Sequence, residues 1–339
     1  MIKLNRKRSG FYEARKNSIL ILAMLLMIAT PVYAAPEDAS SGQSNQAFDN
    51  KIVKRVNVDN IYNHVAYLSE EIGSRGAGTE GELETVEYLV NQFESYGYEN
   101  VSVQEFTFPS GGEEITSYNV EATKEPMKNH DTGQEIIVGS HHDSVPWGQG
   151  ANDDASGTAA LLELARVYAK TPTDSTIKFV AFGAEEYGLW GSRKYAEAMS
   201  AEDAENTVAM FQMDMVGSAD AGDLVMFTAN GEKNTVTDLG AAAGSRVSEL
   251  VPYSELGRSD HVAFHNLGIP AALFIHTPLE PWYHSEDDVI EHISKEKLKN
   301  VADIVGSAIY QAARKDTPAL EKSNVAPVPV DYYYEEPNL

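Results

Sequence analysis

Five side chains of the types that commonly hold metal ions fall where polar loops follow apolar runs of the chain. They are two imidazoles and three carboxylates: His141, Asp153, Glu186, Asp214 and His284. The set suits two zinc ions, each with one His and one terminal carboxylate, joined by the remaining carboxylate. Two Zn²⁺, three carboxylates and one hydroxide make a neutral core, which costs far less to bury than a charged one.

The spacing of His141 and Asp143 suggests a metal ligand and its hydrogen-bond acceptor. His141 ends an apolar run, and Asp143 lies on the same face two residues later if the strand continues. Its carboxylate then accepts the proton of the ring nitrogen that faces away from the metal. His142 points to the opposite side, so we expect it to have a structural role.

Taken singly, each of these residues also has an ordinary explanation. The run 152–154 precedes a helix, and one of its two Asp residues is expected to cap that helix. A Glu pair such as Glu185 and Glu186 commonly starts a solvated helix. Asp214 would be an ordinary turn residue, and a lone His such as His284 would be unremarkable. The prediction therefore depends on the whole set falling at strand ends or in the adjoining loops.

The elements that must position these residues alternate along the chain. Apolar or alternating runs predict strands at 101–108, 117–122, 135–140, 176–183, 209–213, 224–228 and 271–275. Helical spacing and end signals predict helices at 57–69, 79–96, 155–170, 188–200, 235–244, 259–265 and 294–314. This order predicts a single α/β domain, a mixed, mostly parallel twisted sheet with helices on both faces. Such sheets carry their chemistry at the carboxyl ends of the strands.

Residues 1–34 have the features of a secretory signal peptide. A basic segment precedes an apolar run, 19–29, that is too short to span a membrane comfortably, and 32–34 offers a cleavage site. We therefore expect a secreted protein with no stable membrane insertion after cleavage; a retained N-terminal anchor is the alternative. Residues 35–54 are predicted to be a linker or short propeptide, 55–315 the folded domain, and 316–339 a Pro- and Tyr-rich tail.

The composition excludes several classes of protein. Residues 1–34 hold six of the 26 Lys and Arg and one of the 51 Asp and Glu, so the remainder carries a formal charge of −30. Such a surface repels nucleic acid and anionic membranes. The absence of Cys excludes disulfides, thiolate catalysis and Cys-ligated zinc.

Five motifs, in this order, resemble those of the secreted di-zinc aminopeptidases of the bacterial leucyl aminopeptidase type. They are His141-x-Asp143, Asn152-Asp153-Asp154-x-Ser-Gly157, Glu185-Glu186, Asp214-Met-x-Gly217 and Tyr283-His284-Ser. Each motif is weak alone, but five in the right order are specific, and the resemblance covers about residues 55–315. Glutamate carboxypeptidases and glutaminyl cyclases are relatives that share this fold.

The resemblance implies a role for individual residues. Asp153 is the bridging ligand, and Glu185 is the general base. The Tyr283 hydroxyl helps to stabilise the oxyanion, and Arg258 and Asp260 lie near the substrate pocket.

The resemblance also implies a cis peptide bond between Asp153 and Asp154 and zinc-peptidase character for residues 55–315. The sequence shows no inserted domain between the early strands and His141, so we expect a compact one-domain form. Some secreted relatives have a Cys pair in the loop before the last His. This chain has Trp282 there, so packing must fix the loop.

The implied activity is hydrolysis of the N-terminal residue from peptides with a free N-terminus, by a water that two zinc ions activate and Glu185 deprotonates. Three alternatives remain. One is a glutaminyl cyclase-like acyltransferase with one zinc, and another is a zinc carboxypeptidase of the same fold. The third is a non-catalytic ectodomain that binds through its acidic surface, with Ca²⁺ as a possible structural ion.

Overall fold

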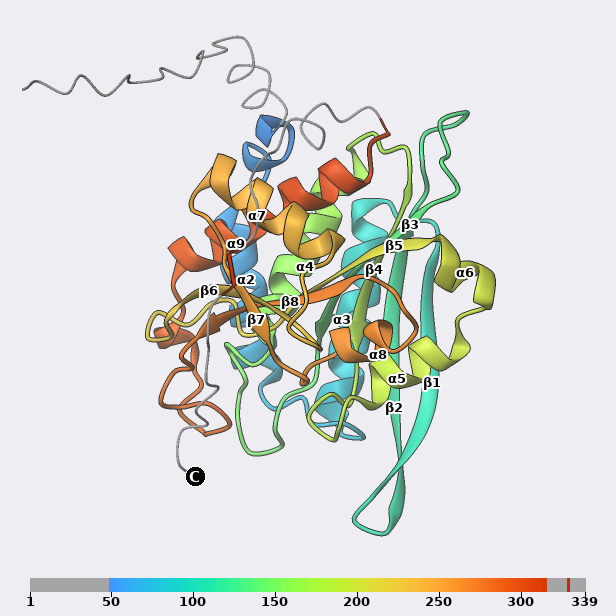
Figure 1. The fold of residues 1–339 in the computed structure, drawn as a ribbon. Helices are drawn as coiled ribbons and strands as arrows, with labels where there is room; N and C mark the ends of the chain where they lie inside the picture. The colour runs from blue at the N-terminus through green and yellow to red at the C-terminus, as the bar shows by residue number, and fades with distance from the viewer. Residues whose placement is uncertain (1–48, 316–327, 330–339) are drawn as a thin grey trace, which may run out of the picture. The chain divides into compact units, whose positions relative to one another are not determined.

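The structure is a computed structural model that describes residues 49–315, 328 and 329. It is built on one eight-stranded sheet with the order β1-β2-β4-β3-β5-β8-β6-β7 (Figure 1). The strands are β1 (Val101–Ser110), β2 (Glu113–Lys124), β3 (Glu135–His141), β4 (Thr176–Phe182), β5 (Thr207–Met213), β6 (Asp223–Thr228), β7 (Tyr253–Glu255) and β8 (Ala271–Thr277). Strands β4, β3, β5 and β8 form a parallel centre, with antiparallel pairs beside it at β2 and β6. The predicted mixed, mostly parallel sheet is confirmed.

Helices cover both faces of this sheet. One face carries α2 (Val58–Ala66), α3 (Glu80–Tyr96), α4 (Ala155–Ala169), α7 (Thr235–Val247) and α9 (Lys295–Ala312), and the other carries α5 (Trp190–Ala198), α6 (Ala201–Asn206) and α8 (His261–His265). Short π- and 3₁₀-helices lie at Tyr67–Ile72 and Ile290–His292. Side chains alternate between the two faces of the sheet along β3. Ile136 and Val138 therefore pack in one hydrophobic core, and Ile137 packs in a second one.

The helix ends follow local sequence signals. Asp154 caps α4 by accepting the Gly157 N–H at 2.7 Å, which confirms that one Asp of 152–154 is a cap. Thr79 caps α3. The sequence Thr79-Glu-Gly-Glu82 has the pattern of a capping box, but only half of the box forms, because the carboxylate of Glu82 accepts the N–H of Gly78 instead of the N–H of the cap residue.

The folded domain begins earlier than residue 55, so the predicted boundary at 54 is wrong. Residues 49–53 are helical, the side chain of Ile52 is fully buried in the main core, and Asp49 pairs with Arg246 at 2.8 Å. The predicted signal peptide 1–34, residues 35–48 and most of the predicted tail lie outside the described residues. Within the tail, Val328 accepts the N–H of Tyr253 at 2.9 Å, beside β7. A search of the described residues finds no helix with the length and apolar character to cross a membrane.

A buried imidazole between α2 and α3 makes the stability of the fold depend on pH. His64 is 9% exposed, its Nδ1 lies 2.6 Å from the Tyr88 hydroxyl, and its Nε2 lies 3.0 Å from the Tyr96 hydroxyl. Burial lowers the pKa of His64 to about 4, although Glu163 opposes this shift. In the unfolded chain His64 binds a proton near pH 6.5, whereas in the folded chain it does so only near pH 4. The free energy of unfolding therefore falls as the pH drops from about 6.5 toward 4.

We expect wild-type protein to lose about 2 kcal/mol of unfolding free energy from His64 between about pH 7.5 and pH 5. His64→Gln keeps a polar side chain without a titrating group, so it should lose that much less over the same interval. Urea unfolding of both proteins at both pH values measures the difference, and other titrating groups cancel. Parallel losses in the two proteins would show that His64 does not titrate in this way.

Candidate metal centre

All five predicted ligands lie at one edge of the sheet because the central strands are parallel. His141 ends β3, Glu186 follows β4, Asp214 follows β5, and His284 lies in the loop after β8. Asp153 lies in the turn before α4. Carboxyl ends of parallel strands meet at the same edge, so residues up to 143 positions apart in the sequence are brought together there.

The carboxylate of Asp153 lies between the two imidazoles. Its Oδ1 is 3.1 Å from Nε2 of His141, and its Oδ2 is 3.2 Å from Nε2 of His284. Asp214 Oδ1 is 3.4 Å from the same nitrogen of His141, and Glu186 Oε2 is 3.0 Å from that of His284. The structure thus contains two clusters of one His and one terminal carboxylate that share Asp153.

The donor atoms of this site fit divalent zinc. Imidazole nitrogens and carboxylate oxygens are its ordinary ligands in catalytic sites. Glu186 Oε1 and Asp214 Oδ1 are buried and accept no hydrogen bond, and such orphaned oxygens call for a cation. The two groups that can hold an ion are His141 with Glu185 and Asp214, and Asp153 with Glu186 and His284, each with ligand atoms within 4.8 Å of one another. Distance alone therefore also admits Glu185 as a ligand.

The electrostatics of the site follow from crowding carboxylates and imidazoles in a buried place. Burial opposes the charge of His284, but hydrogen bonds to Asp153 and Glu186 outweigh it and raise the pKa of His284 to about 10. Burial raises the pKa of Glu186 to about 7, and the charge of Asp153 adds to the shift. Burial likewise raises the pKa of the Glu185 carboxyl well above its ordinary value; the adjacent His141 opposes the shift.

Asp143 holds the site in a different way from the predicted one. Strand β3 stops at His141, and the nearest acceptor for His141 Nδ1 is the main-chain carbonyl of Asp143, at 3.1 Å; a carboxylate oxygen is 3.5 Å away. That carboxylate accepts the N–H groups of Glu185 at 3.1 Å and Glu186 at 3.2 Å. Asp143 therefore supports the turn that carries both Glu residues. His142 is buried and its Nε2 contacts the Tyr118 carbonyl at 2.8 Å, so its structural role is confirmed.

Asp288, which the sequence pattern did not single out, and Asn152, which belongs to the second motif, hold the loop of Asp153. Asp288 accepts the N–H of Asn152 at 2.8 Å and the N–H of Asp153 at 3.0 Å. The side chain of Asn152 donates to Glu280 and accepts the N–H groups of residues 217 and 218, which ties three loops together. The peptide bond between Asp153 and Asp154 is cis, as the resemblance predicts.

One predicted ligand and several residues near the others have a left-handed backbone that L-amino acids rarely adopt. Ala184, Met215, Ser259 and His284 have φ of 53°, 55°, 70° and 56°. Each such residue costs on the order of 1–3 kcal/mol, and such strain concentrates where function fixes the backbone. Ser259 also donates to Asp214 Oδ2 at 2.8 Å, so its conformation supports a ligand directly.

A small cavity opens above the cluster. Its wall is formed by Asp153, Glu185, Asp214, Met215, Leu256, Arg258, Ser259, Leu273, Ile275, Tyr283 and His284. Arg258 and Tyr283 are therefore on the cavity wall, beside the cluster, as the resemblance implies. Asp260 is not: its side chain is fully buried, and it accepts a hydrogen bond from Gln212 at 3.1 Å. A direct contact between Asp260 and substrate has no support from this geometry.

The loop before His284 is fixed by ring packing, as expected in a chain without Cys. Trp282 stacks on His292 with ring centroids 3.7 Å apart. Trp147, from the loop after β3, donates its ring N–H to the main-chain carbonyl of His284 at 2.9 Å. Two indoles therefore hold the backbone that presents this ligand.

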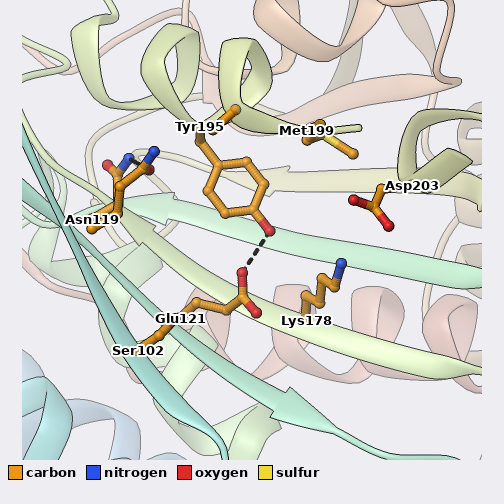
Figure 2. A pocket seen from close by; sticks show the side chains of 9 residues that line it. Ser102, Asn119, Glu121, Lys178, Tyr195, Met199 and Asp203 are labelled. Atoms are coloured by element: carbon orange, nitrogen blue, oxygen red, sulfur yellow. Dashed lines mark hydrogen bonds between the residues drawn. The ribbon is translucent and has the colours of Figure 1, made fainter. Parts of the chain in front are cut away.

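A second cavity lies away from the cluster, between α5, α6 and the strands β1, β2 and β4 (Figure 2). It is larger, about 230 Å³ against about 40 Å³, but it shares no lining residue with the first. In Figure 2 the Tyr195 hydroxyl donates to Glu121, at 2.6 Å. The part of the chain that the structure describes contains no third cluster of metal-binding side chains, so a structural calcium site has no support.

Comparisons with known proteins agree with this site. A family model described as "Peptidase family M28" matches residues 119–309. Aminopeptidase YwaD of Bacillus subtilis is 41% identical over 209 residues, which are 59% of this chain and 46% of that protein. Leupeptin-inactivating enzyme 1 of Streptomyces exfoliatus is 30% identical over 276 residues, 74% of this chain and 61% of that protein. The chain thus spans about half the length of these curated relatives.

This chain matches solved structures over a larger share of their length than it matches the curated relatives. An aminopeptidase from Aneurinibacillus sp. strain AM-1 has a TM-score of 0.75 and 38% identity, over 85% of this chain and 100% of the other. BSAP, a zinc aminopeptidase from Bacillus subtilis, has a TM-score of 0.72 and 26% identity, over 78% of this chain and 97% of the other. With the family description matching more than half of the sequence, the chain belongs to peptidase family M28.

Proposed function

We propose that this protein is a secreted aminopeptidase with two zinc ions per chain. The observation that carries the proposal is the position of Asp153, whose two carboxylate oxygens face one imidazole each. One carboxylate shared by two His-containing clusters is an arrangement suited to two adjacent cations. Three of the four relatives described above, YwaD, the Aneurinibacillus protein and BSAP, are aminopeptidases by name, and BSAP is named a zinc aminopeptidase, which supports the same assignment.

In this proposal His141, Asp153 and Asp214 would hold one zinc, and Asp153, Glu186 and His284 the other. Zinc supplies Lewis-acid chemistry, which polarises a carbonyl and lowers the pKa of water toward neutrality. Glu185, in the cavity wall, takes a proton from the attacking water and delivers it to the leaving amine. The Asp143 carboxylate keeps Glu185 in place by accepting the main-chain N–H of Glu185. The Tyr283 hydroxyl donates to the oxyanion.

The cavity also suggests which end of a peptide is cleaved. Acidic side chains, among them Glu185 and Asp214, lie beside an apolar wall of Met215, Leu256 and Leu273. Carboxylates favour a free α-ammonium group, and the apolar wall accepts the side chain of the first residue. We therefore propose peptides with a free N-terminus as substrates; neither nucleic acid nor membrane is a proposed partner.

The test uses protein purified from the culture medium, whose N-terminus is expected at Ala35. A panel of aminoacyl-anilides should be hydrolysed, N-acetylated anilides should not, and a strong chelator should abolish the activity until zinc is restored. Metal analysis of the same sample should give about two zinc ions per chain. About one zinc with cyclisation of N-terminal Gln would support the acyltransferase instead, and cleavage confined to C-terminal residues would support a carboxypeptidase. Activity that persists without metal would end the proposal.

A further inference from the structure

Arg75 is a buried cation beside the metal centre that the proposed mechanism does not use. Among residues 49–315, 328 and 329 it is the one Arg or Lys with a buried side chain. All five hydrogen bonds of its guanidinium go to main-chain carbonyls: Leu68 at 3.1 Å, Gly73 at 3.0 Å, His142 at 2.9 Å, Gln149 at 2.6 Å and Gly150 at 2.8 Å. A buried charge is tolerated only with such complete hydrogen bonding.

These bonds hold both ends of the segment that joins two ligands. His142 directly follows the ligand His141, and Gly150 comes three residues before Asp153. The main-chain N–H of Arg75 also donates to Ser144 Oγ, at 3.0 Å, within the same segment. Loop 142–150 is thereby fixed at its start, its middle and its end by one residue from a distant part of the chain.

Close packing shows how tightly Arg75 and the Asp153 turn fit together. A Cβ placed on Gly150 would lie 2.3 Å from the Asp153 carbonyl oxygen and 2.9 Å from Nη2 of Arg75. Gly150 also has a φ of 55°, so a side chain is excluded on both grounds. The guanidinium of Arg75 and the backbone of Asp153 therefore both pack closely against Gly150.

The charge of Arg75 also matters at this place. The carboxylates whose charges act on it most strongly are Asp288, Asp143, Asp154 and Asp153. Three of these, Asp288, Asp143 and Asp154, accept main-chain N–H groups of ligands or of residues next to them, and Asp153 is the shared ligand itself. The fixed positive charge of Arg75 lets these carboxylates remain together in a buried place. The planar guanidinium, with its five N–H donors, suits the five hydrogen bonds to carbonyl groups.

We propose that Arg75 is a positioning residue for the zinc cluster. By fixing loop 142–150 and the backbone of Asp153, Arg75 sets the affinity of the protein for both zinc ions. This inference rests on the proposed two-zinc function. Partners of metal ligands commonly change affinity by about 10- to 100-fold when they are replaced. Arg75 acts one step further out, through the main chain, and it acts on both ions because Asp153 is shared.

The test compares Arg75→Lys with wild type and with Arg246→Lys. Lysine keeps the charge but cannot reach five carbonyls from one planar group. Arg246, which pairs with Asp49, provides the same substitution away from the cluster. Zinc dissociation constants are measured by competition with a chromophoric chelator, and melting of the zinc-free proteins reports the cost to the fold. We expect Arg75→Lys to bind both zinc ions roughly 10- to 100-fold more weakly, and Arg246→Lys to bind them as wild type does.

Each result either supports or overturns the proposed role of Arg75 in zinc affinity. Wild-type zinc affinity in folded Arg75→Lys overturns the inference, even if the zinc-free protein melts at a lower temperature. If Arg75→Lys does not fold, Ser144→Ala removes one attachment of the same loop and should weaken zinc binding severalfold; unchanged affinity there also overturns it. Wild-type protein that takes up fewer than about two zinc ions would refute the proposed function, independently of Arg75.

Discussion

Glu185→Gln is expected to lose roughly 10² to 10⁴ in kcat while keeping about two zinc ions per chain. Glu185 lies in the cavity wall, and its N–H is held by Asp143. Gln fills the same space but cannot accept and return a proton. Because general acid–base transfer by one group contributes a factor of this size, the loss should appear in kcat with little change in KM.

The measurement also decides between two roles that distance leaves open. Glu185 has an oxygen within 4.8 Å of the ligand atoms of His141 and Asp214, as a metal ligand would. Its neighbour provides the matched control, since Glu186 Oε2 contacts His284 Nε2 at 3.0 Å. Glu186→Gln should lose about one zinc per chain together with activity. Loss of zinc from Glu185→Gln, or near-normal turnover in a zinc-replete sample, would remove Glu185 from the role of base.

Asp153→Asn should remove both zinc ions and abolish hydrolysis, the largest effect expected of any single substitution at this site. Asn has nearly the same shape and leaves the main-chain bond to Asp288 intact, but it removes the charge that faces both imidazoles. Ligands must be negatively charged or neutral donors suited to the ion, and an amide is a poor replacement for a bridging carboxylate.

Stability gives a second measurement for Asp153→Asn that does not depend on activity. A ligand present at a thousandfold excess over its Kd stabilises the folded state by about 4 kcal/mol. Zinc should therefore raise the melting temperature of wild type but not of Asp153→Asn. Asp214→Asn is the control: Asp214 contacts His141 alone of the two imidazoles, so this variant should retain about one zinc and part of the shift. Full zinc content in Asp153→Asn would refute the shared-ligand arrangement.

The grouping of the five predicted ligands could be expected from the sequence because its signals are local. Each ligand follows an apolar run or precedes a helix, and the ends of strands and helices are set by residues within a few positions. His141, Glu186 and Asp214 appear at the carboxyl ends of β3, β4 and β5 for this reason. The shared orientation of those strands then places the side chains at one edge.

Predictions that depended on the path of a loop were weaker. The expected contact between the Asp143 carboxylate and His141 assumed that the strand continues, and β3 stops at His141. Asp260 directly follows Arg258 and Ser259 of the cavity wall, but the turn into α8 directs its side chain to Gln212. The start of the domain was placed too late because residues 49–53 are polar except for Ile52 and Val53, and the burial of Ile52 comes from distant partners such as α9.

Periodicity and neighbouring residues were enough to predict the fold class, the residue types of the proposed ligands, the cap at Asp154 and the order of the motifs. Contacts between distant segments were needed to show that Asp153 faces both imidazoles, that Asp143 supports the Glu pair, and that Arg75 and Asp288 hold the loop around Asp153. Except for the contact between Asp153 and His141, which are 12 residues apart, those contacts join segments from 42 to 136 residues apart. Hydrogen bonds over such separations depend on strand order, register and loop path, which no local pattern of residue types encodes.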